Sequence, residues 1–135
     1  MSMDKIVEDV KKIPIEKGDS IFVHTALSSV GYSGGDPAAI IDALIGKVGT
    51  EGRIFMPSFV SNIYAIDYLA DDPIFDVQKT PSRMGLITER FRLNYDVARS
   101  VHPTHSVLVW GKDKEEYTKE HSESPWPFDQ KSPFY

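Results

Sequence analysis

The sequence predicts an α/β domain in which a mainly parallel sheet is flanked by helices. Three observations favour this class: segment 20–25 is β-rich and apolar, segment 37–48 repeats apolar residues at helical spacing, and segment 53–59 is again β-rich. Strand, helix and strand joined by short turns are typical of a right-handed βαβ unit with two parallel strands. The chain as a whole is therefore expected to be organised around its first half.

Length and composition narrow the class of protein. The 135 residues suit one domain, so residues 1–135 are expected to form a single α/β unit. Twenty acidic against fifteen basic residues give a formal net charge of −5, which argues against nucleic-acid binding because no basic face is visible. The absence of cysteine excludes disulfides and thiolate chemistry. No segment approaches the roughly 20 apolar residues of a membrane span, and no signal peptide is visible, so a cytoplasmic protein without membrane contact is expected.

The N-terminal elements follow from local patterns. Apolar residues at helical spacing predict an amphipathic helix over 4–13, which Pro14 ends. The strand 20–25 is expected to be buried because it is β-rich and mostly apolar. The helix 37–48 after it is expected to begin with the carboxylate of Asp36 as its N-cap and a proline in its first turn.

In the rest of the chain, predicted strands continue to alternate with predicted helices and loops. Further strands are predicted over 53–59, 97–100 and 106–110. Segment 61–79 lacks any period and predicts a long loop. Thr80 and Pro81 repeat the pattern of a capping hydroxyl followed by proline, which predicts a helix running to Asn94. A charged helix is expected over 113–121.

The loop 26–35 is the first candidate site, since it pools serines and glycines between a strand and a helix. It lacks the glycine and lysine spacing of dinucleotide-binding and P-loop motifs. Hydroxyls and free backbone N–H groups at a helix N-terminus still suit a phosphate. A plain turn is the alternative interpretation of the same residues.

Two further segments combine cations and hydroxyls. Segment 99–106 reads R-S-V-H-P-T-H-S, and Pro103 between its two histidines argues against a helical zinc site, so no metal is expected. A histidine, an arginine and hydroxyls suit a phosphate or an acyl carbonyl, although a simple polar loop remains an alternative. Segment 80–85, which reads T-P-S-R-M-G, is either an anion-binding helix start or merely a capped one.

Four ordered blocks carry a resemblance to a known family. They are V-H-T-A-L-S-S-V-G at 23–31, I-F-M-P-S-F at 54–59, and the two segments at 80–85 and 99–106. In the same order they resemble the V-H-S-S-L-S-S-h-G, h-h-M-P-T-F, T-P-S-x-M-G and R-S-x-H-P-T-H-S segments (h, apolar) of the aminoglycoside 3-N-acetyltransferase family. Ser132-Pro133 is similar to the S-P-h that opens that family's next helix.

The resemblance implies an activity and a cofactor site. Members of the family are transferases that move an acetyl group from acetyl-CoA, their co-substrate, to an amino group of an aminoglycoside. The expected substrate is therefore a small-molecule amine. The associated context is antibiotic resistance. By position in the matching blocks, the residues expected to bind the cofactor are His24, Thr25, Ala26, Leu27, Ser28, Ser29, Gly31, Ser82, Arg83, Met84, Ser100, His102 and Ser106. The pyrophosphate of CoA is expected on the serine and glycine loop, with the acyl end toward His102 and Ser106.

This sequence departs from the family pattern at several points, and these departures leave other functions open. Members are about twice this length, and the later N-T-x-x-H-x-x-E segment that supplies their general base has no match here, so no catalytic residue is assigned. Thr25 and Ala26 replace the usual Ser-Ser. A helix start at Ser132 followed by the end of the chain suggests truncation at the C-terminus. The fragment is thus expected to hold the N-terminal, CoA-binding portion of the fold. The alternatives are a non-catalytic CoA- or nucleotide-binding remnant, which pairs its sheet edge as a homo-oligomer, and an interaction domain.

Overall fold

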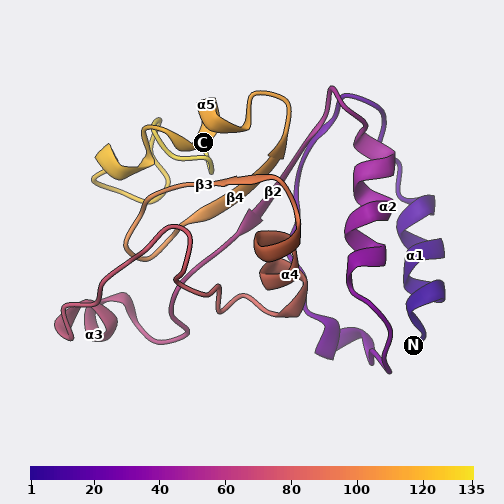
Figure 1. The fold of residues 1–135 in the computed structure, drawn as a ribbon, viewed down its shortest axis with the longest axis horizontal. Helices are drawn as coiled ribbons and strands as arrows, with labels where there is room; N and C mark the ends of the chain where they lie inside the picture. Colours follow the sequence, from indigo (N-terminus) through magenta and orange to yellow (C-terminus); the bar gives the residue numbers. More distant parts are fainter.

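The computed structural model describes residues 1–135, and its centre is one mixed sheet of four strands (Figure 1). The strands lie in the order β1-β2-β4-β3. Their bounds are β1 Ser20–Phe22, β2 Arg53–Pro57, β3 Val97–Arg99 and β4 Val107–Gly111. β1 and β2 run parallel, with Ile21 opposite Ile54, whereas β4 runs antiparallel to both of its neighbours.

The α/β class predicted from the sequence is confirmed, but the prediction of a mainly parallel sheet is wrong. Only the pairing of β1 with β2 is parallel, and it belongs to the predicted βαβ unit. β2 with β4 and β3 with β4 are antiparallel pairings. The reason is the connection 100–106 between β3 and β4, which is too short for the crossover that parallel neighbours require, so these two strands form a hairpin.

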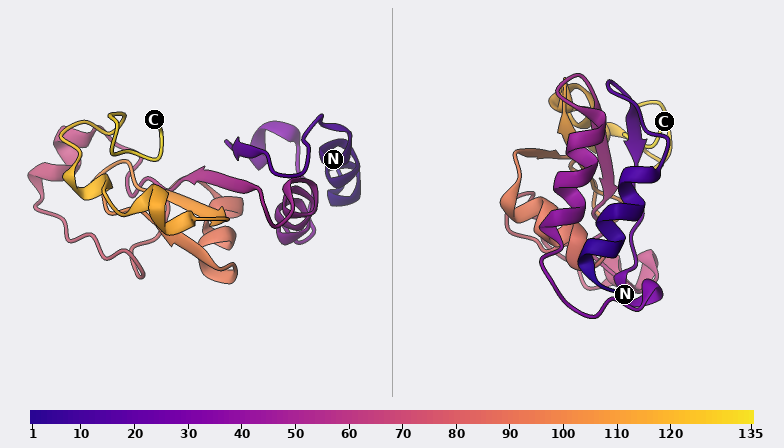
Figure 2. Two further views of the ribbon diagram at one scale, coloured as in Figure 1. Left: turned by 90° about the horizontal axis from the view of Figure 1, so that it is seen from above. Right: turned by 90° about the vertical axis from the view of Figure 1, so that its right-hand side faces the viewer.

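The helices surround this sheet unevenly. Their bounds are α1 Met3–Lys12, α2 Ala38–Val48, α3 Ala65–Ala70, α4 Leu86–Asn94 and α5 Lys114–Thr118, with short 3-10 turns at η1 Leu27–Val30 and η2 His121–Glu123. α1 and α2 lie side by side at one end of the molecule, and α3 projects from the opposite end (Figure 2). None of these helices combines the length and the apolar character needed to cross a bilayer.

The first two helices begin close to their predicted starts. The hydroxyl of Ser2 accepts a hydrogen bond from the backbone N–H of Lys5 at 3.4 Å and so caps α1. The carboxylate of Asp36 accepts one from the N–H of Ala38 at 3.0 Å. The capping role predicted for Asp36 is therefore confirmed, although the regular part of α2 starts one residue later than expected.

The first strand is shorter and more exposed than the sequence predicts. β1 ends at Phe22, and the ladder extends one step further because the N–H of Val23 donates to the carbonyl of Phe55 at 2.8 Å. The side chain of Phe22 is 37% exposed. The expectation of a buried strand is wrong because β1 lies at the edge of the sheet and has β2 as its single neighbour.

The helix predicted from Thr80 begins instead at Leu86. Gly85, directly before it, has a φ of +111°, a conformation that side-chain-bearing residues rarely adopt and that no helix contains. The hydroxyl of Thr80 accepts a hydrogen bond from the N–H of Asp76 at 2.8 Å and thus holds a loop together. The hydroxyl-proline pattern therefore marks a turn of the preceding loop, and segment 80–85 is an irregular segment with bends that precedes the helix.

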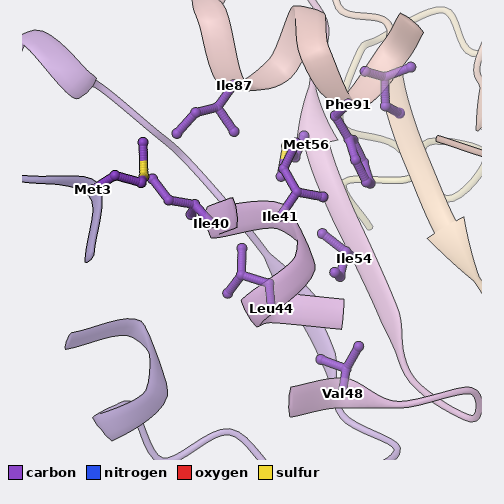
Figure 3. Packing of buried hydrophobic residues seen from close by; sticks show 10 residues of the cluster. Met3, Ile40, Ile41, Leu44, Val48, Ile54, Met56, Ile87 and Phe91 are labelled. Carbon is purple, nitrogen blue, oxygen red and sulfur yellow. The ribbon is translucent and has the colours of Figure 1, made fainter. Parts of the chain in front are cut away.

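The main core lies between α2, α4 and one face of the sheet (Figure 3). Its ten buried members are Met3, Ile40, Ile41, Leu44, Val48, Ile54, Met56, Ile87, Phe91 and Leu108. Full burial of side chains of this size stabilises the fold by about 1.5–3 kcal/mol each relative to exposure. The opposite face of the sheet carries a smaller cluster of Phe55, Val107 and Val109, against which Phe134 packs.

Candidate functional site

The predicted blocks meet at one edge of the sheet. Because β1 and β2 are parallel, their carboxyl ends lie together, and the segments that follow them begin at this edge. The hairpin loop 100–106 reaches the same edge, since the N–H of Ser58 donates to the carbonyl of Ser106 at 2.7 Å. Segment 80–85 joins them through the N–H of Arg83, which donates to the carbonyl of Phe59 at 2.8 Å.

The loop after β1 is mostly open to solvent. His24, Ser28 and Ser29 are exposed, and η1 places the two serines on its outer side. The ring of His24 stacks on Phe22 with a centroid distance of 5.1 Å. Gly31 ends η1 with a φ of +61°, which favours glycine at this position. Hydroxyls that face solvent in this way are available to a ligand.

A small cavity adjoins that loop. It measures about 170 Å³ and is lined mainly by apolar side chains: Ile6, His24, Thr25, Ala26, Leu27, Val30, Ile40 and Ile87. Ile87 belongs to α4 and His24 to the loop after β1, so the cavity lies between the first predicted block and the helix that follows the third. An apolar hollow beside exposed hydroxyls suits a ligand with an apolar arm and a polar head.

The N-terminus of α2 is less available to a phosphate than the sequence indicates. The carboxylate of Asp36 already occupies the N–H of Ala38, and a second anion there would meet its negative charge. Gly35 also has a structural role, because a Cβ atom on it would lie 2.8 Å from the Cβ of Met3. The glycine thus permits α1 to pack against this loop, and this packing explains its presence without a ligand.

Segment 82–84 is anchored from both sides. The N–H of Ser82 donates to the carboxylate of Glu89 at 2.8 Å, and its hydroxyl accepts from the N–H of Met84 at 3.2 Å. Glu89 in turn pairs with Arg92 at 2.5 Å. The side chain of Ser82 is buried by these contacts, whereas Arg83 is exposed and presents a cation to solvent.

Ser100 and Ser106, both predicted to bind the cofactor, are fully buried. The hydroxyl of Ser106 donates to the carbonyl of Ser100 at 2.7 Å, and the hydroxyl of Ser100 accepts from the N–H of Val107 at 2.8 Å. These bonds close the hairpin loop on itself. Direct cofactor contact stays a prediction for both residues, while the contacts that the structure gives them are internal.

Arg99 fixes the base of the same loop. Its guanidinium donates to the hydroxyl of Ser106 at 3.1 Å and to the carbonyls of Ser58 at 3.1 Å, Val77 at 3.3 Å and Thr80 at 2.5 Å. Burial lowers the pKa of Arg99 to about 10, and the nearby cation of Arg92 acts in the same direction. The residue remains charged at neutral pH. Its donors are used within the protein, so Arg99 positions the loop.

His102 has a defined tautomer. Its Nδ1 atom accepts hydrogen bonds from the backbone N–H groups of Thr104 at 3.2 Å and His105 at 2.9 Å, so the ring proton of the neutral form is on Nε2. Burial, with smaller effects from His121 and His105, lowers the pKa of His102 to about 4. The ring is therefore neutral at physiological pH.

His121 completes a histidine cluster that sequence reasoning missed. It is fully buried, its Nδ1 atom lies 2.7 Å from the hydroxyl oxygen of Ser100, and its ring stacks on His102 at a centroid distance of 4.7 Å. Burial lowers its pKa as well. The sequence gives no signal for this contact, because His121 follows a charged helix far along the chain. No group of three or more acidic or imidazole side chains is arranged to hold a metal ion.

Comparisons with known proteins identify the fold. A family model described as aminoglycoside 3-N-acetyltransferase matches residues 22–135. The chain belongs to the aminoglycoside 3-N-acetyltransferase family. The resemblance read from the four sequence blocks is thereby confirmed, and so is the α/β architecture expected from it.

Individual relatives provide points of reference. The SPbeta prophage-derived aminoglycoside N(3')-acetyltransferase-like protein YokD of Bacillus subtilis is 34% identical over 86% of this chain and 48% of its own length. Its crystal structure matches with a TM-score of 0.76, covering 96% of this chain and 57% of that chain. This chain thus spans about half the length of the curated relatives that it matches.

Among the matching structures that were solved with ligands, two show the two kinds of ligand. One is AAC-IIIb in a binary complex with CoASH, 26% identical with a TM-score of 0.74, covering 98% of this chain and 54% of that chain. The other is AAC-VIa bound to sisomicin, also 26% identical, with a TM-score of 0.77 and the same coverage of both chains. These ligands are properties of those two proteins.

Proposed function

We propose that residues 1–135 form a single α/β unit that binds coenzyme A. The unit is part of an acetyl-CoA-dependent N-acetyltransferase that acts on an amino group of an aminoglycoside or similar amine. The observation that carries the proposal is the convergence of segments 24–31, 82–84 and 100–106 at one edge of the sheet. Membership of the family and the CoASH-bound relative support it further.

The residues present suit such a ligand. Exposed hydroxyls of Ser28 and Ser29 and the cation of Arg83 are available to phosphate oxygens. The apolar cavity beside His24 is suited to the pantetheine arm. When bound, acetyl-CoA supplies the activated acetyl group. The chain's own contribution is to hold this thioester against the sheet edge.

The direct test is calorimetric titration of the full chain with CoA. We expect saturable binding, weakened about tenfold when Arg83 is replaced by Gln, because one charge-assisted hydrogen bond contributes roughly 1.5–3 kcal/mol. A Lys112→Gln variant is the matched control, since Lys112 is an exposed cation that pairs with Glu51 at the opposite edge of the sheet. Absence of CoA binding by a folded sample contradicts the proposal.

A second candidate is a CoA-binding unit without catalysis. It is favoured by the hairpin loop, where the Nδ1 atom of His102 and the hydroxyl of Ser106 are engaged in hydrogen bonds within the protein. A thiol-release assay with acetyl-CoA and sisomicin separates the two. Thiol release above the rate without amine supports the transferase, whereas CoA binding without release supports the non-catalytic unit. Sedimentation of the same sample tests the expected self-association.

A further inference from the structure

A second cavity lies beside β3, the edge strand farthest from β1, where the end of α4 meets the loop before segment 80–85. It measures about 380 Å³ and is lined by Val77, Gln78, Arg92, Val97, Arg99 and Leu108. None of these residues is among those expected from the sequence to bind the cofactor, and none carries a carboxylate. The ionisable side chains in the wall are the two arginines, so the lining of the cavity is positively charged.

Arg92 reaches the cavity from the last turn of α4, and its side chain is only 8% exposed. Its Nε and Nη2 atoms donate to the carboxylate of Glu89 at 2.9 and 2.5 Å, and its Nη1 atom donates to the carbonyl of Gln78 at 2.5 Å. A guanidinium has five N–H groups, of which these bonds use three. The other two, one on each terminal nitrogen, have no acceptor within the protein and are available to a ligand.

Arg99 adds a positive charge that no carboxylate contacts. Its hydrogen bonds all end on uncharged oxygens, namely three backbone carbonyls and the hydroxyl of Ser106. The centre of its guanidinium lies 5.0 Å from the centroid of the Phe75 ring. That contact attracts the cation without neutralising it. Arg99 is therefore satisfied in its hydrogen bonds while its charge remains unbalanced.

A single carboxylate serves both arginines. Glu89 is ionised at neutral pH, because the hydrogen bond from Arg92 lowers its pKa. Burial lowers the pKa of Arg99, and repulsion by Arg92 acts in the same direction, while Glu89 acts against both. Two positive charges against one negative leave one positive charge uncompensated in a largely buried place. Because such a charge is costly away from water, an anion in the adjoining cavity would stabilise the fold.

We propose that this cavity is a binding site for a small organic oxyanion, whose phosphate or carboxylate oxygens accept hydrogen bonds from the two unused N–H groups of Arg92. The planar guanidinium holds its donors in a fixed fork that suits both kinds of head group. The aliphatic side chains of Val77 and Val97 form apolar walls on which a short organic body packs. The site is distinct from the coenzyme A edge and does not depend on the proposed function.

The test is titration of the full chain at low ionic strength with two probes, inorganic phosphate and succinate, followed by calorimetry and by thermal unfolding. We expect saturable binding and a rise in the unfolding temperature with the concentration of the bound probe. Binding of either probe supports the site, and the tighter of the two identifies its preferred head group. CoA is expected neither to displace the probe nor to be displaced by it.

Gln78→Glu is the decisive variant, because it places a negative charge in the wall of the cavity with little change in size. We expect it to weaken binding of the probe about three- to fivefold, the effect of one exposed charge pair, and to leave CoA binding unchanged. Gln130→Glu is the matched control, since Gln130 is also exposed and lines no part of the cavity. Arg92→Gln is expected to weaken binding more than about tenfold, because it removes both charge-assisted donors.

The outcomes separate this site from the proposed coenzyme A site. Absence of binding by both probes, or equal effects of Gln78→Glu and Gln130→Glu, overturns the oxyanion site. Displacement of the probe by CoA also overturns it, because the probe would then occupy the cofactor edge. Failure of CoA itself to bind contradicts only the proposed function. Gln78 is exposed, so its variant keeps the test valid even where Arg92→Gln does not fold.

Discussion

The Nδ1 atom of His121 lies 2.7 Å from the hydroxyl oxygen of Ser100, and both side chains are fully buried. This contact joins the 3-10 turn after α5 to the hairpin loop 100–106. The same hydroxyl accepts the N–H of Val107 at 2.8 Å, so the histidine supports the point where the loop re-enters β4. The candidate site therefore depends on a residue that lies outside all four of the sequence blocks.

Replacing His121 by Ala is expected to lower the free energy of unfolding by about 2–4 kcal/mol, because it removes a buried hydrogen bond and leaves a cavity beside His102. Urea denaturation followed by circular dichroism measures this change. His24→Ala is the control, since His24 is exposed, and it is expected to change stability by less than about 1 kcal/mol. Equal losses in the two variants would show that the buried contact is unimportant.

The histidine cluster predicts how stability depends on pH. The pKa of His102 falls to about 4 in the folded chain from its ordinary value of 6.5, and burial lowers the pKa of His105 and His121 in the same direction. Between these values the unfolded chain binds more protons, so stability is complete above pH 6.5 and is lost as the pH falls toward 4.

Urea midpoints measured at about pH 7 and about pH 5 test this dependence. A His102→Gln variant is expected to lose less stability over that interval, because glutamine does not titrate. An unchanged slope in the variant would assign the pH dependence to other groups.

Arg99→Lys is expected to destabilise the fold by about 2–3 kcal/mol, because lysine cannot reach all the oxygen atoms that the guanidinium binds and leaves buried carbonyls unpaired. The loss should be greatest near Val77 and Thr80, whose carbonyls bond to Arg99. Amide hydrogen exchange of segment 75–80 therefore measures it. Arg90→Lys provides the comparison, since the side chain of Arg90 is 45% exposed, and protection should there be unchanged.

Gly111→Ala is expected to destabilise the fold by more than about 3 kcal/mol, since overpacking and a strained backbone act together. Its φ is +107°, and a Cβ atom would lie 2.2 Å from the carbonyl oxygen of Gly52. Gly46→Ala is a contrasting variant within α2, where a Cβ would meet nothing within 4 Å. For Gly46→Ala we expect the free energy of unfolding to rise by about 0.5–1 kcal/mol, as measured by thermal or urea denaturation. A similar sign for both variants would contradict this account.

Local patterns in the sequence were sufficient for most elements. Apolar spacing located α1 and α2, and β-rich runs located β2, β3 and β4 to within a few residues. The helix start at Thr80 could not be predicted correctly, because the same hydroxyl-proline pattern also stabilises a turn and only the geometry of Gly85 decides between them.

Contacts between distant segments were beyond the reach of local patterns. Nothing near His121 in the sequence indicates that its ring packs under Ser100, and nothing near Phe59 indicates that it faces His105. The family resemblance supplied the blocks at 24–31, 82–84 and 99–106 but not the fact that Ser100 and Ser106 face inward. Both serines are buried because β3 and β4 form an antiparallel hairpin, and the prediction of a mainly parallel sheet did not include this hairpin.

The antiparallel return of β4 beside β2 has a consequence for divergence within this family. One side of the sheet edge is formed by a βαβ crossover, whose register is fixed by the packing of α2. The other side is a hairpin loop, whose stem is fixed by Arg99 and Ser100 and whose tip is held by side-chain contacts such as the stacking of His102 on His121. Insertions or exchanges at the tip leave the crossover undisturbed, so the tip is free to diverge while the βαβ half of the edge keeps its register.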